Sequence, residues 1–274
     1  MRTKLYKAGL RIGVAAKRWT RRPFYDRLNP FEGESRPPLI HCCYHKVGTV
    51  WFLRVLRDVA AHFGMRFGVG ESYEQIRDFE LNHSYDVFLD YGSHVHLSEL
   101  GQYRGSHMIR DPRDMVVSGY FYHLWTSEAW AHFPRAEYRG MSYQQYLNSI
   151  PKEEGLIEEM RRMSFWIPHM ADWDYNDPNI YEIRYEEILR DERRIMRELF
   201  EHYGFRPDAV DTACSVARKY TFERMTSATS GPSHLRSGKS GEWREHFGSV
   251  HRETFKEMFP GVLVQLGYES GPDW

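Results

Sequence analysis

Residues suited to holding an anion lie close together in the stretch YHKVGTVW, residues 44–51. Lys46 supplies a positive charge, Gly48 lets the backbone come close to a ligand, and Thr49 adds a hydroxyl group. The stretch lies between an apolar run and an amphipathic pattern, which predicts a turn from a strand into a helix. At such a turn the N–H groups of residues 47–50 have no helical partner and point toward an anion, helped by the helix dipole. The residues therefore predict a phosphate-binding turn.

A second set of such residues lies in MIRDPRDMVVSGYFYH, residues 108–123. Here Arg110 ends a predicted strand, and Ser118 lies two turns into the helix that follows. An arginine can bind a phosphate with two parallel hydrogen bonds, and a serine can donate one more. The alternative is purely structural, with Arg110, Arg113 and the neighbouring aspartates pairing with one another where the helix begins.

The predicted phosphate site differs from the Walker loop, G-x-x-x-x-G-K-[ST]. The tripeptide GKS at 238–240 does not supply that loop, because the pattern requires glycine at position 233 and Ser233 is there. No acidic residue suited to binding Mg²⁺ is evident after a predicted strand. The sequence therefore disfavours a kinase or a nucleotide hydrolase.

The elements that must position these residues alternate along the chain. Short apolar runs bounded by turn residues predict strands over 38–44, 85–94, 105–111 and 179–185. The spacing of apolar residues predicts helices from Thr49 to a stop at Gly64, over 112–125 and over 191–204. This alternation predicts an α/β fold, with a mostly parallel central sheet, helices on both faces and a P-loop-like strand–loop–helix phosphate site. Ligands bind such folds at the carboxyl ends of the strands, where both sets of residues lie.

Composition narrows the class of protein. The 274 residues are 41% hydrophobic, which suits a single globular domain with a sizeable core. The 37 basic and 38 acidic side chains nearly balance, which argues against a nucleic-acid-binding protein. No apolar run approaches the roughly 20 residues that a membrane-spanning helix needs. Cys42 and Cys43 are neighbours in a predicted strand and point to opposite faces, so we expect reduced cysteines and a cytoplasmic protein.

The amino-terminal segment differs from the rest in charge. Residues 1–30 contain nine Lys or Arg and one acid, Asp26, a net charge of +8. We expect a basic arm over 1–34 and a single domain over 35–274. The arm is either solvated and loosely packed on the domain or in peripheral contact with an anionic membrane. The stretch 226–241 is rich in Ser, Thr and Gly and is expected to form a mobile loop.

Five stretches, in order over residues 39–247, resemble motifs of the cytosolic-type sulfotransferases. YHKVGTVW is similar to their 5′-phosphosulfate loop, Y-P-K-S-G-T-T-W, and RDPRDMVVSGYFYH is similar to their 3′-phosphate motif, R-[DN]-P-[KR]-D-x-x-V-S-x-Y-x-H. RYEEILRD resembles R-Y-E-D-L/M, TFERM resembles S-F-x-x-M, and RSGKSGEWREHF resembles R-K-G-x-x-G-D-W-x-x-x-F. A chance match to all five motifs in sequence is not plausible.

The resemblance implies a donor, 3′-phosphoadenosine 5′-phosphosulfate (PAPS), whose sulfuryl group passes to a hydroxyl or an amine without a metal, leaving the bisphosphate PAP. Lys46, Gly48 and Thr49 would hold the 5′-phosphosulfate, with the backbone of the same turn. Arg110 and Ser118 would hold the 3′-phosphate. The full set of donor-binding residues that it implies is Lys46, Val47, Gly48, Thr49, Val50, Trp51, Arg110, Ser118, Tyr185, Tyr220, Phe222, Arg236, Ser237 and Gly238.

The remaining donor contacts that the resemblance implies come from aromatic rings and from the predicted loop. Trp51 and Phe222 would flank the adenine, where flat rings suit stacking. Tyr185 would touch the edge of the base, and Tyr220 stands where the family usually has a smaller hydroxyl residue. The loop would contribute to the 3′-phosphate site through Arg236 and the backbone at Ser237 and Gly238.

The catalytic residues implied by the resemblance are a base, Lys46 and Ser118. The family's base is a histidine in K-T-H-L-P, and this chain has GSHVHLSELGQ, residues 92–102. Aligning the two places the base at His94, with His96 as the alternative. An imidazole suits the task because its pKa lies near the working pH. The structural alternatives for this H-x-H are a core histidine or, less favoured, a metal-binding pair.

The chain departs from the family's motifs at several positions. Val47 and Val50 replace Ser and Thr, which removes two hydroxyl donors, and His45 replaces the usual Pro. Ser237 replaces a Lys. The segment REHFGSVHRETF only partly resembles the family's dimer motif K-x-x-x-T-V-x-x-x-E, so the oligomeric state is left open. The altered loop favours, as an alternative function, a catalytically silent PAPS- or PAP-binding protein or a membrane-peripheral protein.

The acceptor cannot be read from these motifs, and a small molecule, a lipid or a sugar would each suit the chemistry. The aromatic stretches 120–133 and 163–173 are interpreted either as core or as walls of the acceptor pocket. The acidic stretch KEEGLIEEMRR, residues 152–162, is interpreted as a solvated helix face with pairs at i,i+4 spacing.

Overall fold

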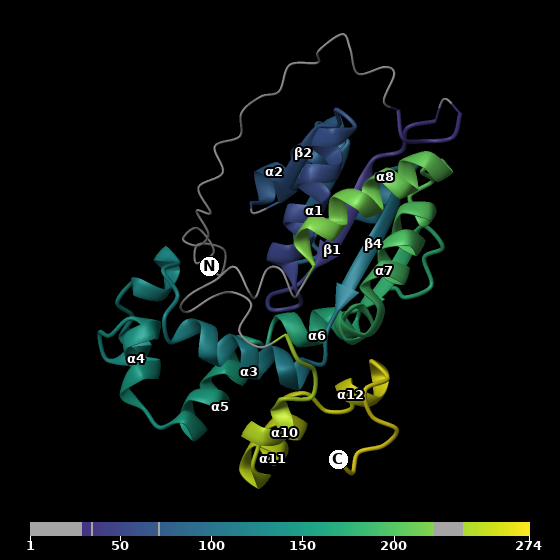
Figure 1. The fold of residues 1–274 in the computed structure, drawn as a ribbon. Coiled ribbons are helices and arrows are strands. Elements are labelled where there is room, and N and C mark those ends of the chain that lie inside the picture. Colours follow the sequence, from purple (N-terminus) through teal and green to yellow (C-terminus); the bar gives the residue numbers. More distant parts are fainter. Residues whose placement is uncertain (1–28, 34, 71, 222–237) are drawn as a thin grey trace.

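The computed structural model has a five-stranded, all-parallel sheet at its centre, flanked by helices (Figure 1). The α/β fold expected from the sequence is confirmed. The structure describes residues 29–33, 35–70, 72–221 and 238–274. Most of the predicted basic arm and of the predicted loop over 226–241 lies outside these residues.

The strands lie in the spatial order β2-β3-β1-β4-β5, which places β1 at the centre. Their bounds are Leu39–Cys43 for β1, Phe67–Gly70 for β2, Val87–Tyr91 for β3, Arg104–Ile109 for β4 and Ile180–Arg184 for β5. In register, Cys43 at the end of β1 pairs with Tyr91 on one side and Met108 on the other. The segments that follow β1, β3 and β4 therefore begin side by side at the carboxyl edge of the sheet.

Helices cover both faces of the sheet and extend beyond its carboxyl edge. In chain order they are α1 (Thr49–His62), α2 (Tyr73–Asn82), α3 (Pro112–His123), α4 (Tyr143–Ser149), α5 (Lys152–Arg162), α6 (Trp166–Ala171), α7 (Tyr185–His202), α8 (Pro207–Ala217), α10 (Trp243–His246), α11 (Ser249–Met258) and α12 (Val262–Gln265). In Figure 1 the arrowhead of β4 points toward α6, and α3, α10 and α11 lie on that side of the sheet. The carboxyl edge therefore faces a second layer of helices.

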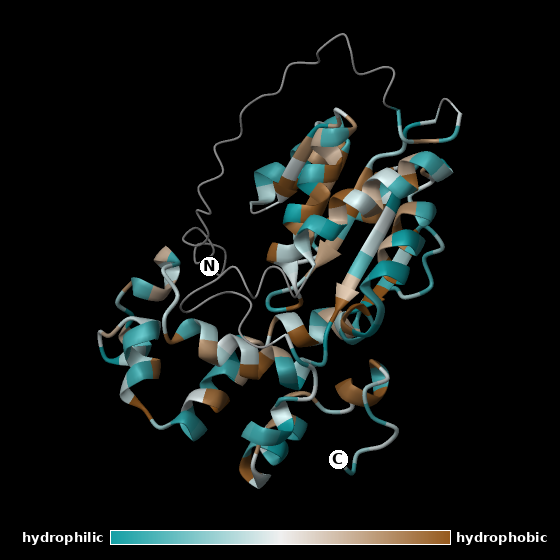
Figure 2. Ribbon diagram, in the orientation of Figure 1, coloured by the Kyte–Doolittle hydropathy of each residue, from teal (hydrophilic) through white to brown (hydrophobic). Residues whose placement is uncertain are grey.

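Alternation along β1 separates the two faces of the sheet. Leu39 and Cys43 belong to the larger core, which includes residues of α1, α7 and α8. Ile40 and Cys42 belong to a smaller core with residues of α2. Figure 2 shows hydrophobic residues in α1 and at the tip of β4, and hydrophilic residues over much of α7. All three cysteines are free, as expected.

Local sequence explains where the helices that matter for the site begin. Asp111 caps α3 by accepting a hydrogen bond from the N–H of Arg113, and Pro112 occupies the first turn, where its missing N–H costs nothing. Gly48 precedes α1 with a φ of 107°, in the left-handed region that glycine tolerates best. Both helices therefore begin directly after a strand, at the carboxyl edge.

The sequence analysis missed one strand, placed the start of one helix too late and misread the burial of one helix face. Strand β2 was missed because FGVG has four residues and two glycines, too short a signal for a period of two. Helix α7 begins at Tyr185 rather than at 191; a kink at Asp191 marks the predicted start. The interpretation of 152–162 as a solvated face is wrong at Glu159, which is fully buried.

Among the residues that the structure describes, no helix combines the length and the apolar character that crossing a membrane requires.

Residues of the predicted arm nearest the domain already pack on it. Phe31 is buried, with its ring edge-on to Phe205 at a centroid distance of 5.3 Å. The backbone of Phe31 forms an antiparallel bridge with that residue, and the carbonyl of Pro30 accepts a hydrogen bond from the N–H of Arg206. The boundary between arm and domain remains a prediction, with this contact on its amino-terminal side.

A buried histidine in β1 makes the fold sensitive to acid. The ring of His41 stacks on Phe52 at 4.1 Å, and its Nδ1 lies 2.7 Å from the Oγ of Ser106. Burial, reinforced by His107, lowers the pKa of His41 from 6.5 to about 3. Below pH 6.5 the unfolded chain therefore binds a proton that the folded chain does not.

We predict that His41 contributes stability that is fully present above pH 6.5 and is lost as the pH falls toward 3. Theory gives a slope of about 1.4 kcal/mol per pH unit for one such group. The free energy of unfolding, measured with urea between pH 7.5 and 5, should therefore fall less steeply in His41→Asn than in the wild type. Parallel curves for the two proteins would contradict this assignment.

Candidate functional site

The predicted phosphate-binding turn links β1 to α1, and its backbone donors are available. The N–H groups of Trp51 and Phe52 both bond to the carbonyl of Gly48, at 3.0 and 3.2 Å. Among the described residues, none accepts a hydrogen bond from the N–H groups of 47–50. The hydroxyl of Thr49 donates to the carbonyl of Tyr44 at 2.9 Å, which closes the turn. The turn thus presents consecutive donors at a helix amino terminus, as an anion site requires.

Only glycine fits at position 48. A Cβ there would lie 3.0 Å from the Cε of Met108 and 3.4 Å from the ring of Tyr185. The positive φ adds backbone strain for any other residue. Lys46 also has a positive φ, 66°, so the turn is wound by two left-handed residues around one intervening valine.

Arg110 follows β4 and joins the turn to a distant part of the chain. It is only 6% exposed, and its guanidinium lies 4.4 Å from the centre of the Tyr185 ring. One Nη donates to the carbonyl of Lys46 at 3.2 Å, and the other donates to the carbonyl of Lys239 at 3.1 Å. Its Nε is buried and has no hydrogen-bond partner among the described residues.

The alternative that Arg110 merely pairs within its own motif is wrong. Arg113 takes that role: it forms two side-chain hydrogen bonds to Asp111, at 3.0 and 2.8 Å, and one to Glu269 at 2.5 Å. Its guanidinium also lies 3.8 Å from the centre of the Trp243 ring. Arg110 is therefore left to contact the phosphate-binding turn.

The closing motif is held against α3. Asp114 accepts hydrogen bonds from the N–H groups of Gly241 and Trp243, at 2.6 and 2.9 Å. Ser118 lies one turn further along α3, on the same side of the helix as Asp114. The structure therefore brings Arg110 together with the segment that begins at Gly238, and it places Ser118 on the side of α3 that carries Asp114. Of the residues predicted to hold the donor, Phe222, Arg236 and Ser237 lie outside the described residues.

Of the residues predicted to contact the adenine, Trp51 lies in α1 and Tyr185 begins α7, while Phe222 lies outside the described residues. Trp51 is buried, edge-on to Phe52 at 5.0 Å, and its indole nitrogen has no partner among the described residues. The hydroxyl of Tyr220 donates to Asp58 of α1. Tyr185 begins α7 between Gly48 and Arg110, and burial raises the pKa of its phenol.

The ammonium of Lys46 points toward α3. Its Nζ lies 3.9 Å from the centre of the Tyr122 ring, and Tyr122 donates to Glu128 at 2.6 Å. This contact belongs to the aromatic stretch 120–133, where Tyr120 and Trp130 are buried in the core. That stretch thus supplies both core and site.

His94 follows β3 and lies beside an aromatic group on α6. The N–H of Gly92 donates to the carbonyl of Cys43 at 2.8 Å, which ties this segment to the end of β1. The His94 ring lies 5.9 to 6.0 Å from the rings of Phe165, Trp166 and His169. Burial, with a contribution from His169, lowers the pKa of His94 below 6.5 and favours the neutral imidazole.

His96 lies in a different environment. Its side chain is 63% exposed, and its Nδ1 lies 3.0 Å from Glu80 of α2. The same carboxylate accepts a hydrogen bond from the backbone N–H of His96 and forms an ion pair with Arg77. The two histidines therefore lie in different environments, although they are only two residues apart. His94 faces α6, and His96 is hydrogen-bonded to α2.

Comparison with known protein families gives a match to the sulfotransferase domain over residues 104–267, more than half of the chain. This chain belongs to the sulfotransferase domain family. The matched part begins at β4, so it contains Arg110, Ser118 and Tyr185 but not the turn at Lys46.

Individual proteins of known sequence are also similar to this chain. It is 24% identical over 184 residues to sulfotransferase 2A6 of Mus musculus, covering 60% of this chain and 57% of that protein. It is 26% identical over 165 residues to 3-beta-hydroxysteroid sulfotransferase of Cavia porcellus, covering 55% and 53%. The chain therefore matches little more than half the length of these relatives.

Two solved structures share its fold. Mouse sulfotransferase SULT7A1, complexed with PAP, superposes with a TM-score of 0.57 at 15% identity and covers 89% of this chain and 93% of that one. Retinol dehydratase, in complex with androsterone and PAP, gives a TM-score of 0.55 at 15% identity, with 87% and 85% covered. Both likenesses include part of the chain that precedes β4.

The sequence analysis did not identify the side chains that pack around the turn between β1 and α1. Tyr44 lies against His107, whose Nδ1 is 2.7 Å from Glu182. His45 is the next residue, and its Nε2 lies 3.2 Å from the Nε2 of His123 in α3. The signal available was the replacement of proline by His45, together with a histidine that ends the Arg110 motif. The described residues contain no cluster of three or more His, Cys, Asp or Glu that could hold a metal.

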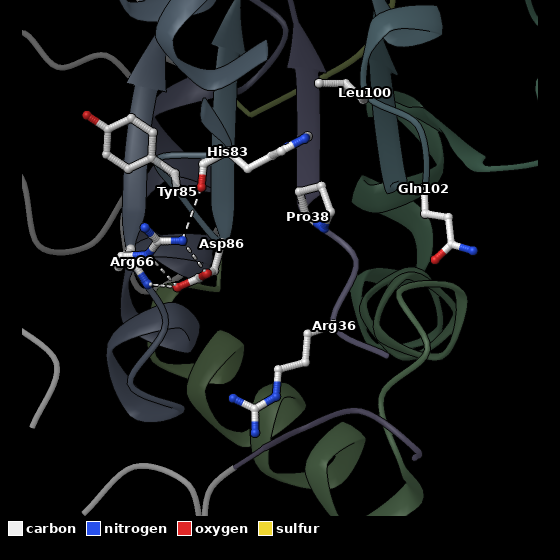
Figure 3. A pocket seen from close by; sticks show the side chains of 8 residues that line it. All are labelled: Arg36, Pro38, Arg66, His83, Tyr85, Asp86, Leu100 and Gln102. Carbon is white, nitrogen blue, oxygen red and sulfur yellow. Dashed lines mark hydrogen bonds and ion pairs between the residues drawn. The ribbon is translucent and has the colours of Figure 1, made fainter. Parts of the chain in front are cut away.

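A separate hollow of about 380 Å³ lies at the opposite end of the sheet, before the strands begin (Figure 3). Arg66 and Asp86 form an ion pair of 2.9 Å on its wall. The same arginine also donates to the carbonyl of His83 at 3.1 Å. Its most prominent charges are thus already paired, and it lies away from the residues of the sulfotransferase motifs.

We predict that Gly48→Ala destabilises the protein more than an alanine at another glycine of positive φ that has open space around it. Gly204 has a φ of 82° and open space around its Cβ position, so Gly204→Ala is the matched control. Both variants should lose about 1 kcal/mol from the positive φ. Gly48→Ala should lose roughly 1 kcal/mol more, because its Cβ presses on the end of the Met108 side chain and meets the ring of Tyr185. Equal losses in urea unfolding would show that the turn is not tightly packed.

Proposed function

We propose that this protein is a PAPS-dependent sulfotransferase that moves a sulfuryl group to a hydroxyl or an amine of a small acceptor. The observation that carries the proposal is the position of Arg110. Its two Nη groups join the turn at Lys46 to the segment at Lys239, so the two predicted phosphate-binding segments meet at one buried cation. PAPS carries phosphate groups on the 3′ and 5′ sides of a single ribose, and two adjacent anion sites match it.

The residues present suit the two phosphate groups. The N–H groups of residues 47–50, which have no acceptor among the described residues, and the ammonium of Lys46 favour the 5′-phosphosulfate. The buried Nε of Arg110 lacks a partner among the described residues. A buried donor without an acceptor costs free energy, which a phosphate oxygen would recover. Ser118 of α3 and the backbone of Gly238 in the closing motif would complete the 3′-phosphate site.

The reaction is a displacement at sulfur. The acceptor oxygen or nitrogen forms a bond to sulfur as the bond from sulfur to the bridging oxygen breaks, and the electron pair leaves with PAP. His94 takes the proton of the acceptor, for which its lowered pKa keeps it neutral. Lys46 stabilises the charge that grows on the bridging oxygen, and the N–H groups of the turn steady the sulfuryl oxygens.

The acceptor would bind beside α6. Phe165 and Trp166 lie around His94, and Tyr91 lies 6.1 Å from the Trp166 ring. Phe165 is exposed while its neighbours Ile167 and Met170 are buried, so the stretch 163–173 supplies both a core face and a face toward the base. Flat apolar groups on the acceptor would suit these rings.

The test of the proposal has two stages. Calorimetry with PAP and with ATP on the full chain should show tight binding of PAP and weak binding of ATP. A mass-spectrometric screen of metabolite extracts supplied with PAPS should then show products heavier by one sulfo group. Binding of PAP without turnover of any acceptor would favour the silent nucleotide-binding protein, and no binding of PAP would refute the donor.

We predict that Lys46→Ala lowers turnover by about a hundredfold or more, because the leaving bisphosphate loses its stabilising charge. Arg110→Ala should chiefly weaken the binding of PAP, since Arg110 contacts the two phosphate-binding segments. Steady-state kinetics and calorimetry on both variants separate these effects. A fall in turnover for Arg110→Ala with unchanged PAP affinity would contradict the assignment.

We predict that His94→Ala lowers turnover by about a hundredfold or more, whereas His96→Ala leaves it within about threefold. Because burial lowers the pKa of His94, the neutral base persists below pH 6.5 and the acid decline in turnover should lie below that value. The pH profile of turnover and the two variants test this together. Near-full activity in His94→Ala would move the base to His96.

A further inference from the structure

A row of buried polar side chains runs from the phosphate-binding turn into the helices beyond the sheet. His45 Nδ1 lies 2.5 Å from the hydroxyl of Tyr91, and His45 Nε2 lies 3.2 Å from His123 Nε2. His123 Nδ1 lies 2.8 Å from Glu159, whose carboxylate also accepts the hydroxyl of Tyr143 at 2.7 Å. His45, His123, Glu159 and Tyr143 are all buried.

The helices are shaped to admit this carboxylate. A Cβ on Gly119 of α3 would lie 2.3 Å from Glu159 Oε1, so a glycine is required opposite it. The rings of His45 and His123 stack with an interplanar angle of 1° at 5.1 Å. Burying a carboxylate is costly unless it is hydrogen-bonded. These contacts therefore describe a built network rather than a chance approach of polar groups.

The protonation states of these side chains can be assigned one after another, starting from Glu159. Burial acts to raise the pKa of Glu159, but His123, Arg162 and Tyr143 together hold it below 4.5, so it is an anion. Burial lowers the pKa of His123, which is therefore neutral and donates from Nδ1 to Glu159. Its Nε2 must then accept, and the only group facing it in the row is His45, donating from Nε2. His45 Nδ1 in turn accepts from the phenol of Tyr91.

Charged groups around the row leave this assignment intact. Lys46 lies beside His45 in the chain, and its charge adds to the lowering of the pKa of His123. Arg162 of α5 lies over the Trp130 ring at 3.5 Å and the Tyr143 ring at 5.2 Å, on the Glu159 side. Glu128 binds Tyr122 at 2.6 Å on the Lys46 side. Both cations thus disfavour a positive charge on His123.

We propose that His45, His123 and Glu159 are positioning residues that hold the Lys46 turn in shape for the sulfuryl donor, an inference that rests on the proposed function. His45 stands where the family's motif has proline, a residue that stiffens the chain by fixing φ. Here two hydrogen bonds from one side chain tether the turn to β3 and α3. Because Lys46 follows His45 directly, the tether sets where Lys46 begins its left-handed step.

The first test needs no loss of function. ¹⁵N NMR of the imidazoles in the full-length protein, assigned with His45→Gln and His123→Gln, reports which nitrogen of each ring carries the proton. We expect the Nε2–H form for His45 and the Nδ1–H form for His123 at pH 7.5. A doubly protonated His123, or the reverse pair of tautomers, would overturn the directional network.

The second test measures the turn itself, through PAP affinity by calorimetry. His45→Ala and Glu159→Gln should each weaken PAP binding by roughly tenfold, the effect of losing one buried hydrogen-bonded partner. The double variant should bind about as weakly as the weaker single variant, because both changes break the same row. His45→Gln keeps an N–H donor and should recover most of the affinity.

The control is His251→Ala, which removes a buried histidine bonded to Gly248 and to the carbonyl of Glu153, outside the row. It should lower the melting temperature while PAP affinity stays within about twofold. Unchanged affinity in folded His45→Ala, or losses in the double variant that multiply, would overturn the positioning role. Failure of the wild type to bind PAP would instead overturn the proposed function.

Discussion

The site depends on a buried cation, Arg110, at the carboxyl edge of the sheet. Arg110 is nearly excluded from water, and a charge in such a position is costly unless polar groups surround it. Carbonyls of Lys46 and Lys239 meet two of its donors, and the face of Tyr185 meets its plane. Asp114 is near enough for Arg110 to oppose the rise that burial causes in its pKa, but that carboxylate is already bonded to the backbone of the closing motif. The arginine thereby fixes three separate segments around one point and keeps a donor there for an anion.

The turn that faces this cation is held from both of its strand neighbours. Tyr44 leans on His107 of β4, which is paired with Glu182 of β5 at 2.7 Å. His45 leans on His123, which is paired with Glu159 at 2.8 Å. Consecutive residues of an extended segment point in opposite directions, so two imidazole–carboxylate pairs can brace the turn from opposite sides. The next residue, Lys46, leaves the extended conformation with a φ of 66°, is only partly buried and reaches the ring of Tyr122.

Much of this arrangement follows from the sequence, and the remainder depends on contacts between distant segments. The strand–turn–helix around Gly48 and the strand–helix around Arg110 were predictable because each has a local signal: an apolar run, a special backbone residue and a cap. The meeting of Arg110 with Lys239 was implied only by the order of the motifs, since no local pattern places residues 129 positions apart. Glu159 was misread because KEEGLIEEMRR looks solvated on its own, and its burial depends on Gly119 in another helix. Strand β2 was too short to carry a pattern.

The valine at position 47 shows how a departure from the family's motif can leave the chemistry of the turn unchanged. Val47 is fully buried, so its side chain faces the core and its N–H alone remains to face the site. A hydroxyl at that position would have to be buried or to turn the residue around, whereas valine gains from burial. The hydroxyl of Thr49 is likewise directed at the carbonyl of Tyr44, where it closes the turn. The donors that this turn presents are therefore those of its backbone and of Lys46, and the side chains of its neighbours hold that backbone in place.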